Sequence, residues 1–158
     1  PGSLTITLGS DSIVIKDQRP LVLANLQFPT GWRIDDFVGY LNDHVYFWPG
    51  DASGLIGPGD RFLAHYASEE PLVVRFPFRA LIAANPDTPP LFSPYNSGAP
   101  RMQGGRPVKR GPDLFGPATQ QQRRPNEVIE VAFRSSVLLP SETTIAGGHD
   151  AWAPLKDD

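Results

Sequence analysis

The sequence predicts an α+β fold in which a small mixed sheet is flanked by short helices. Strand-type and helix-type apolar patterns follow one another irregularly, each pattern is short, and turn residues separate them. Such an order is typical of α+β domains, whereas a doubly wound sheet requires regular alternation. A chain of 158 residues and 17.3 kDa has the size of one domain with one hydrophobic core.

The first segment predicts a β-hairpin. Leu4–Leu8 alternates apolar and polar residues, which places its apolar side chains on one face of a strand. Turn residues follow at Gly9–Ser12, and the β-branched run Ile13–Ile15 supplies the second strand. Leu21–Leu26 fits either a strand or a short helical turn, and its Ala and Leu content favours the helix.

The clearest helical pattern is Ile34–Leu41, where apolar residues recur every three or four positions. Two Asp residues lie in its first turn, where the helix dipole favours acidic side chains. Asn42 and Asp43 end this helix, and the aromatic run Val45–Trp48 then predicts a strand. We expect that strand to be central in the sheet.

The middle of the chain predicts a helix, a strand and a second short helix. Asp60 can cap a helix that carries the apolar residues of 62–66. Leu72–Phe78 predicts a strand, and Pro77 within it favours an edge position or a strand end. The next helix, Arg79–Ala84, stops before an Asn-Pro pair.

A long segment from Pro94 to Pro125 has almost no apolar periodicity and is rich in Gly, Pro, Arg and Gln. Loops of such length are usually functional or disordered. Both descriptions are expected to apply, with Tyr95–Gly98 ordered and Gln120–Arg124 mobile. Val128–Phe133 then predicts the last strong strand.

The predicted domain covers residues 4–140. Residues 1–3, Pro-Gly-Ser, are expected to be the remnant of an expression tag, and a natural segment upstream of Leu4 is expected to be missing. Residues 141–158 are expected to form a C-terminal tail, with Trp152 docking back onto the domain.

Composition excludes several classes of function. The net charge of −3 provides no global basic field for non-specific binding of nucleic acid. No apolar run approaches the roughly 20 residues that span a bilayer, so we expect a soluble protein without a membrane partner. The absence of cysteine excludes disulfides, thiol nucleophiles and zinc-thiolate sites, and it fits a reducing compartment such as the cytoplasm.

Glu130 is the first candidate for a chemical role. The period of two along a strand places Glu130 on the same face as Val128 and Ala132. A carboxylate among small apolar side chains needs a hydrogen-bond partner or a ligand. The alternative, which the residues alone favour, is an edge strand on which Glu130 faces water.

Other polar residues give weaker signals. Arg19 follows the second predicted strand and has the fork geometry to bind a phosphate or carboxylate, although a solvated surface turn is the favoured alternative. The three histidines lack metal-ligand spacing, so no metal site is predicted. For His44, a pocket position and the favoured solvated helix terminus both stay open.

The long loop is locally basic although the chain is acidic. A basic loop can guide a phosphate-bearing substrate, but it can equally be a solvated connector. Its basic residues are Arg101, Arg106, Lys109, Arg110, Arg123 and Arg124. The glycines at 54, 57 and 59 lack the context of a phosphate loop, and no nucleophile elbow is present.

Several short stretches together resemble an uncharacterised bacterial domain family. That family is in turn similar to DarT-like ADP-ribosyltransferases, which modify DNA using NAD. The resemblance covers most of the chain from Leu4 to Pro140. The stretches that carry it are Asp17–Pro20, Leu41–Trp48, Ser93–Gly98, Arg110–Phe115 and Val128–Val131.

The resemblance implies an ADP-ribosyltransferase-like fold with NAD as the substrate. Glu130 is similar by position to the catalytic glutamate of such enzymes. Arg19 is similar to the arginine that binds the cofactor, and Tyr46 and Phe47 to the wall of the NAD cleft. Asn96 and Ser97 then supply hydrogen bonds to the ribose or the amide of NAD.

One departure from the family pattern keeps the alternatives open. The early His-Thr segment that helps to bind NAD has no match in the chain. The leading hypothesis is ADP-ribosyl transfer or NAD hydrolysis, with an unknown acceptor. The rivals are a non-catalytic binding or interaction module on the same fold and a toxin fragment whose partner supplies the missing segment.

Overall fold

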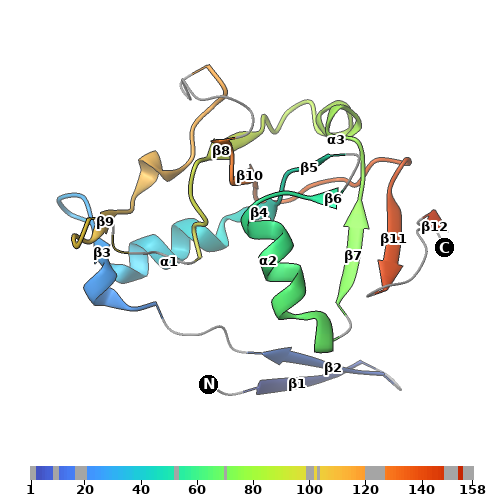
Figure 1. The fold of residues 1–158 in the computed structure, drawn as a ribbon, viewed down its shortest axis with the longest axis horizontal. Coiled ribbons are helices and arrows are strands. Elements are labelled where there is room, and N and C mark those ends of the chain that lie inside the picture. The colour runs from blue at the N-terminus through green and yellow to red at the C-terminus, as the bar shows by residue number, and fades with distance from the viewer. Residues whose placement is uncertain are drawn as a thin grey trace.

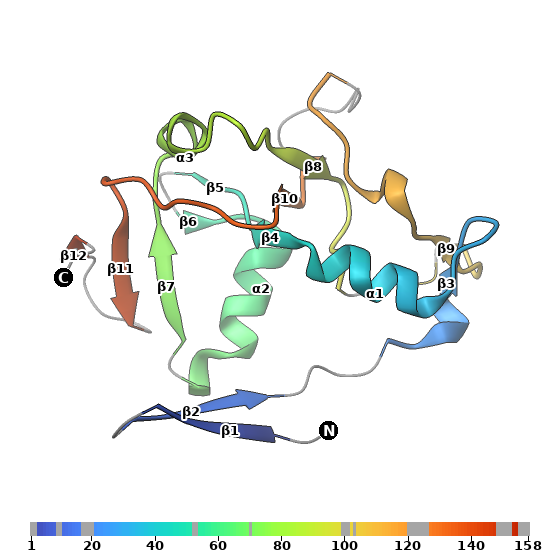
Figure 2. The same ribbon diagram turned by 180° about the vertical axis from the view of Figure 1, so that it is seen from behind.

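The computed structural model describes residues 3–8, 11–16, 21–51, 54–69, 71–98, 102, 104–119, 127–147 and 153–154. Within these ranges the chain forms three α-helices and several small β-sheets, so the fold is α+β (Figures 1 and 2). The strands do not join into the single mixed sheet that the sequence predicted. Short strands separated by turns form small separate sheets instead, most of them antiparallel.

The central sheet has three antiparallel strands in the order β4-β10-β8. Strand β4 is His44–Phe47, β10 is Glu130–Arg134 and β8 is Leu91–Ser93. The expectation that the aromatic strand is central is therefore wrong, because β10 pairs on both sides and β4 on one. Four consecutive residues of β10 are buried, whereas most of β4 is half-buried, so aromatic content did not indicate position in the sheet.

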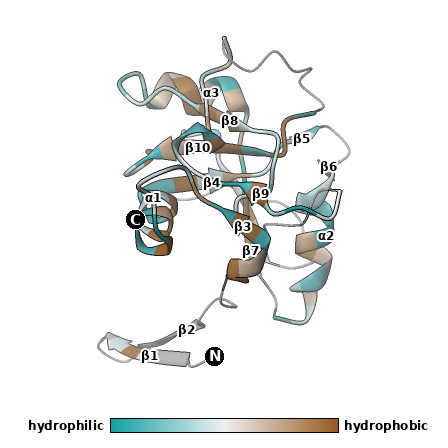
Figure 3. Ribbon diagram, turned by 90° about the vertical axis from the view of Figure 1, so that its left-hand side faces the viewer, coloured by the Kyte–Doolittle hydropathy of each residue, from teal (hydrophilic) through white to brown (hydrophobic). Residues whose placement is uncertain are grey.

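Two helices cover the two faces of this sheet. Helix α1, Ile34–Asn42, buries Phe37 against the face that carries Ala132. Helix α3, Phe78–Ala84, buries Leu81 against Val131 and Phe133 on the other face. The described residues thus form two core clusters where the chain length predicted one. Figures 1 and 2 place α1 and α3 on opposite sides of the strands, and Figure 3 shows hydrophobic stretches in both helices.

The three helices begin and end close to the predicted residues. The Asp36 carboxylate accepts the Arg33 N–H at 2.8 Å at the start of α1. Helix α2, Pro58–His65, begins two residues before Asp60, so Asp60 lies in its first turn and is not its cap. At the end of α3, the Asn85 side chain donates to Leu81 O and Leu138 O, each at 2.8 Å.

A second antiparallel sheet has the order β12-β11-β7. Strand β7 is Leu72–Arg75, β11 is Thr144–Gly147 and β12 is Ala153–Pro154. The segment expected to be a tail therefore contributes a strand that pairs with β7. Pro77 lies two residues after the end of β7 and is the N-cap of α3, in agreement with a strand end. Trp152 and Gln120–Arg124 lie outside the described residues.

The predicted hairpin is confirmed, because β1 (Ser3–Leu8) pairs antiparallel with β2 (Asp11–Lys16). Ser3, which was assigned to a tag remnant, is part of β1. Figures 1 and 2 place this hairpin beyond the lower ends of α2 and β7. None of the helices in the described ranges has the length and apolar character needed to cross a membrane.

The long loop is attached to the domain by a short parallel pair of strands. Strand β3, Leu26–Gln27, pairs with β9, Val108–Lys109.

Short strands β5, Gly50–Asp51, and β6, Gly54–Leu55, form a separate antiparallel pair. Single turns of 3-10 helix lie at Leu23–Asn25, Ala67–Glu69 and Pro112–Leu114.

Candidate functional site

Glu130 opens the central strand and is enclosed by protein. Because Ala132 lies opposite Tyr46 in the antiparallel register, Glu130 shares the sheet face of these two residues. Its side chain is only 4% exposed, and its Oε2 accepts the Ser97 backbone N–H at 3.0 Å. The Trp48 side chain provides a further hydrogen bond. The alternative of a solvated Glu130 on an edge strand is therefore wrong.

Burial dominates the electrostatics of this carboxyl group. Loss of solvent raises the pKa of Glu130, since water no longer stabilises the charged form. Hydrogen bonds from Ser97 and Trp48 and the positive charge of Arg110 oppose this rise without cancelling it. Burial also raises the pKa of Tyr46, with the nearby Glu130 as the second cause.

This raised pKa predicts a pH dependence of stability. A carboxyl group whose folded-state pKa exceeds its ordinary value stabilises the fold below about pH 4.5, and this contribution is lost as the pH rises through the folded-state pKa. We expect the melting temperature of the wild type, relative to that of Glu130→Gln, to fall as the pH increases above about 4.5. Thermal melts of both proteins in matched buffers measure this difference. A pH-independent difference would contradict the prediction.

Trp48 owes its position to the start of helix α2. A Cβ at Gly59 would lie 2.9 Å from Cβ of Trp48, so only glycine allows this close approach. The Trp48 ring also packs edge-on against Phe62, with ring centroids 4.3 Å apart. Helix α2 therefore fixes the indole that binds Glu130.

The turn after β8 supplies the other partner of Glu130. The Tyr95 N–H donates to the Ser93 Oγ at 3.1 Å, which shapes the chain as it leaves the strand. Ser97 is buried, and its side chain also interacts with Glu130 and Tyr46. The Tyr46 hydroxyl donates to Leu41 O at 2.7 Å. This network fastens the 95–97 turn to the sheet.

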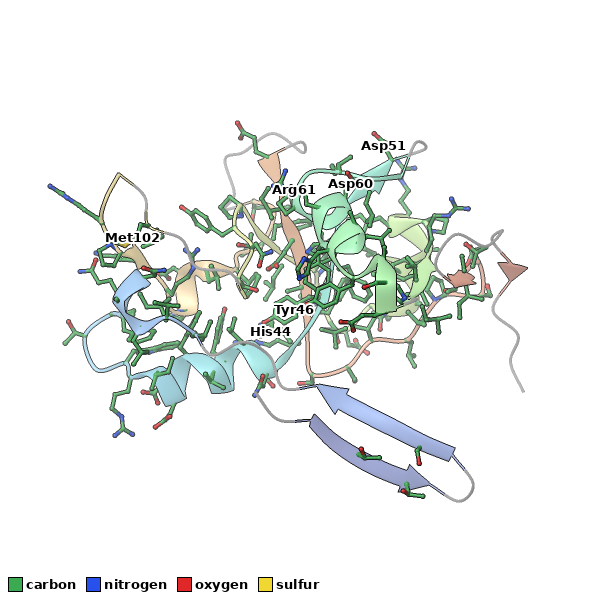
Figure 4. All side chains as sticks on the ribbon, turned by 60° about the horizontal axis from the view of Figure 1, so that its bottom comes forward. His44, Tyr46, Asp51, Asp60, Arg61 and Met102 are labelled. Carbon is green, nitrogen blue, oxygen red and sulfur yellow. The ribbon has the colours of Figure 1, made fainter. Side chains whose placement is uncertain are left out.

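An open pocket of about 620 Å³ lies beside this network. Helix α2 forms one wall, and the turn after β8 together with the long loop forms the other. Tyr95, Asn96 and Arg110 line it together with Arg61 and Phe62 of α2 and with Tyr66, the C-cap of that helix. Figure 4 labels Arg61 and Met102, which line the pocket from α2 and from the loop. Ile129 is part of the lining, whereas Glu130, the next residue, is buried and is not part of it.

Arg110 is the buried cation of the site. Its side chain is 3% exposed, and its guanidinium carbon lies 4.6 Å from the Tyr95 ring centroid, in cation–π geometry. Burial lowers the pKa of Arg110, whereas Tyr95 and Glu130 favour its charged form. The backbone N–H of Arg110 donates to Gln27 O at 2.9 Å, and this hydrogen bond connects the backbone of Arg110 to β3.

The structure brings some of the predicted site residues together and separates others. Glu130, Tyr46 and Ser97 meet on one face of the sheet, and Asn96 lines the adjacent pocket. Phe47 belongs to the opposite face, where it packs against Phe76 and Phe133 with ring centroids 5.2 and 5.9 Å away. It therefore forms no wall with Tyr46, because neighbouring residues of a strand point to opposite faces.

Arg19, expected to bind the cofactor, lies outside the described residues. His44 is not at a solvated helix terminus: it is buried at the start of β4, with Nδ1 2.7 Å from Tyr40 O. Figure 4 shows His44 near Tyr46, and their ring centroids are 6.3 Å apart.

Sequence reasoning missed the roles of Trp48, Tyr95 and Arg110. Trp48 had a usable signal, since it follows Tyr46 by two positions and so continues the same strand face. Arg110 was only one of six basic residues in a loop without periodicity. No local pattern distinguishes the one arginine that folds back against a tyrosine.

The fold and the site define an α+β domain with a buried carboxylate next to residues that line an open pocket. Among the described residues, no group of three or more His, Asp or Glu side chains is arranged to hold a metal ion. Residues 1–144 match a family of unknown function (DUF7002), and the chain belongs to this family. No curated protein and no solved structure matches the chain.

Proposed function

We propose that this chain binds NAD in the pocket beside α2 and transfers the ADP-ribosyl group to an acceptor or to water. One observation carries the proposal: the buried Glu130 carboxyl group binds Ser97 and interacts with Arg110, and Arg110 and Asn96, the neighbour of Ser97, line a pocket of about 620 Å³. The buried Arg110 and the Tyr95 ring form part of the lining of that pocket. The resemblance to ADP-ribosyltransferases assigns Glu130 the catalytic role independently of this geometry.

The chemistry requires a negative group at the ribose. When the bond from ribose C1′ to nicotinamide breaks, its electron pair leaves with nicotinamide and positive charge develops on the sugar. The ionised Glu130 stabilises this charge and accepts a hydrogen bond from a ribose hydroxyl. An acceptor or a water molecule then bonds to C1′ and releases a proton. Asn96 lines the pocket, and in this proposal its side chain binds the nicotinamide amide or the ribose.

Only the ionised form of Glu130 can play this part. Because burial raises the pKa of Glu130, the fraction of active enzyme increases as the pH rises through that value. The Ser97 N–H and the Trp48 side chain already bind the carboxylate, so a ribose hydroxyl has to use one of its remaining acceptor positions.

The direct test is binding and turnover of NAD by the full chain. We expect NAD to raise the melting temperature, because a ligand at 100 times its Kd stabilises the folded state by about 2.7 kcal/mol. We also expect release of nicotinamide, measured by chromatography. An unchanged melting temperature at millimolar NAD, with no nicotinamide released, would overturn the proposal.

A second candidate is a non-catalytic binding module on the same fold. The observation that favours it is the enclosure of Glu130, which is 4% exposed and accepts hydrogen bonds from protein groups. In this case the carboxylate anchors the turn of Ser97 to the central strand. The pocket then binds a nucleotide without breaking it, and NAD raises the melting temperature but releases no nicotinamide.

A further inference from the structure

We propose that Arg110 is the anion-binding group of the pocket beside α2 and that the pocket takes phosphate-bearing ligands, a nucleoside diphosphate in particular. The inference rests on the proposed function for the location of the ligand but not for any turnover. It assigns to Arg110 the phosphate contact that the sequence suggested for Arg19.

The hydrogen bonding of Arg110 is the first argument. An arginine side chain carries five N–H donors and stays protonated in proteins. Within the described part of the chain, its side chain makes one hydrogen bond, from Nη1 to Lys109 O at the long distance of 3.3 Å. Its buried Nε has no partner. A buried cation with unused donors is costly unless an anion binds it.

The rigidity of Arg110 is the second argument. Its backbone N–H is bound to Gln27 O, and the guanidinium rests on the Tyr95 ring. The next residue, Gly111, packs so closely on Pro29 that a Cβ would lie 2.5 Å from the proline Cγ. An arginine held in this way loses little side-chain entropy when it binds an anion.

The surroundings of Arg110 are the third argument, because they favour an anion that carries an aromatic group. Arg61 and His65 lie on the α2 wall of the pocket and add basic groups at its exposed side. Glu130, the acidic group that acts on Arg110, is not part of the lining. Phe62 and Tyr66 line the same wall with ring centroids 4.4 Å apart, which offers an apolar surface for a base.

The guanidinium fork of arginine suits a phosphate group as well as a carboxylate. Two parallel N–H groups match two oxygens of a phosphate, which makes arginine well suited to bidentate binding. The phosphate groups of a nucleoside diphosphate can occupy the donors of Arg110 while its base lies against Phe62 and Tyr66. The pocket volume of about 620 Å³ falls within the usual range for small-molecule sites.

Isothermal titration of the full chain with ADP, pyrophosphate and adenosine tests the proposal. We expect ADP and pyrophosphate to bind and adenosine, which lacks phosphate, to bind much more weakly. Arg110→Gln is expected to weaken ADP binding about 10- to 100-fold, the loss expected for hydrogen bonds to a charged group. Arg110→Lys keeps the charge without the fork and is expected to recover only part of the affinity.

Arg106→Gln is the matched control, because Arg106 is an exposed arginine of the same loop and does not line the pocket. It is expected to bind ADP as the wild type does. Since Arg110→Gln removes a buried side chain, its melting temperature and circular dichroism are recorded. If Arg110→Gln does not fold, the ADP affinity of Arg110→Lys tests the proposal in its place.

Specific outcomes overturn the inference. Wild-type chain that binds neither ADP nor pyrophosphate at millimolar concentration contradicts it, as do folded Arg110 variants that bind ADP with wild-type affinity. If Arg110→Lys binds NAD with wild-type affinity, the inference is rejected, but the proposed function is not. Arg110-dependent binding of ADP without nicotinamide release from NAD supports the inference and rejects the proposed turnover.

Discussion

Glu130→Gln is expected to lower the turnover of NAD by a factor on the order of 100 to 1,000, the usual cost of losing one electrostatic contact made in the transition state. Glutamine keeps the shape of glutamate and an oxygen that can accept the Ser97 N–H, so the 95–97 turn stays in place. It carries no negative charge to stabilise the developing cation. Affinity for NAD is expected to change little, because the charge acts mainly in the transition state.

Nicotinamide release at saturating NAD gives the turnover, and calorimetric titration gives the affinity. Glu142→Gln is the matched control, since Glu142 is an exposed glutamate that bonds only to Ser141 within the described residues and lies outside the pocket lining. It should retain full turnover. A Glu130→Gln protein with wild-type turnover would reject the catalytic role and favour the binding module.

Phe133→Ala is expected to destabilise the domain by about 3–5 kcal/mol, the usual cost of truncating a fully buried phenylalanine. Phe133 lies in the central strand β10 with no solvent exposure and packs with Leu81 and Val131 in the core beneath α3. Its ring also meets Phe47 edge-on. Alanine would leave a cavity between the sheet and the helix.

Urea unfolding followed by tryptophan fluorescence measures this loss. Phe78→Ala, at the start of α3, provides the comparison, because Phe78 is 41% exposed and loses less burial on truncation. If Phe133→Ala cost no more than Phe78→Ala, the assignment of the second core to this face of the sheet would be wrong.

Part of this structure followed from the sequence alone. The hairpin, the helices α1 and α3 and the strand β10 were predicted close to their observed limits, because short-range apolar periodicity determines such elements. The same periodicity placed Glu130 on the face of Ala132. It could not tell whether that face was wet or covered, since exposure depends on what packs against the strand.

Long-range pairing decided the rest. Strand β10 lies between β4 and β8, and β11 pairs with β7 from a segment that looked like a tail. Arg110 reaches Tyr95 because β9 pairs with β3, and no local pattern encodes that contact. The sequence alone determined the hairpin, the three helices, the strands β4, β7 and β10, and the strand face that carries the carboxylate. Tertiary structure decided which groups surround it, because burial and charge proximity arise only when distant segments meet.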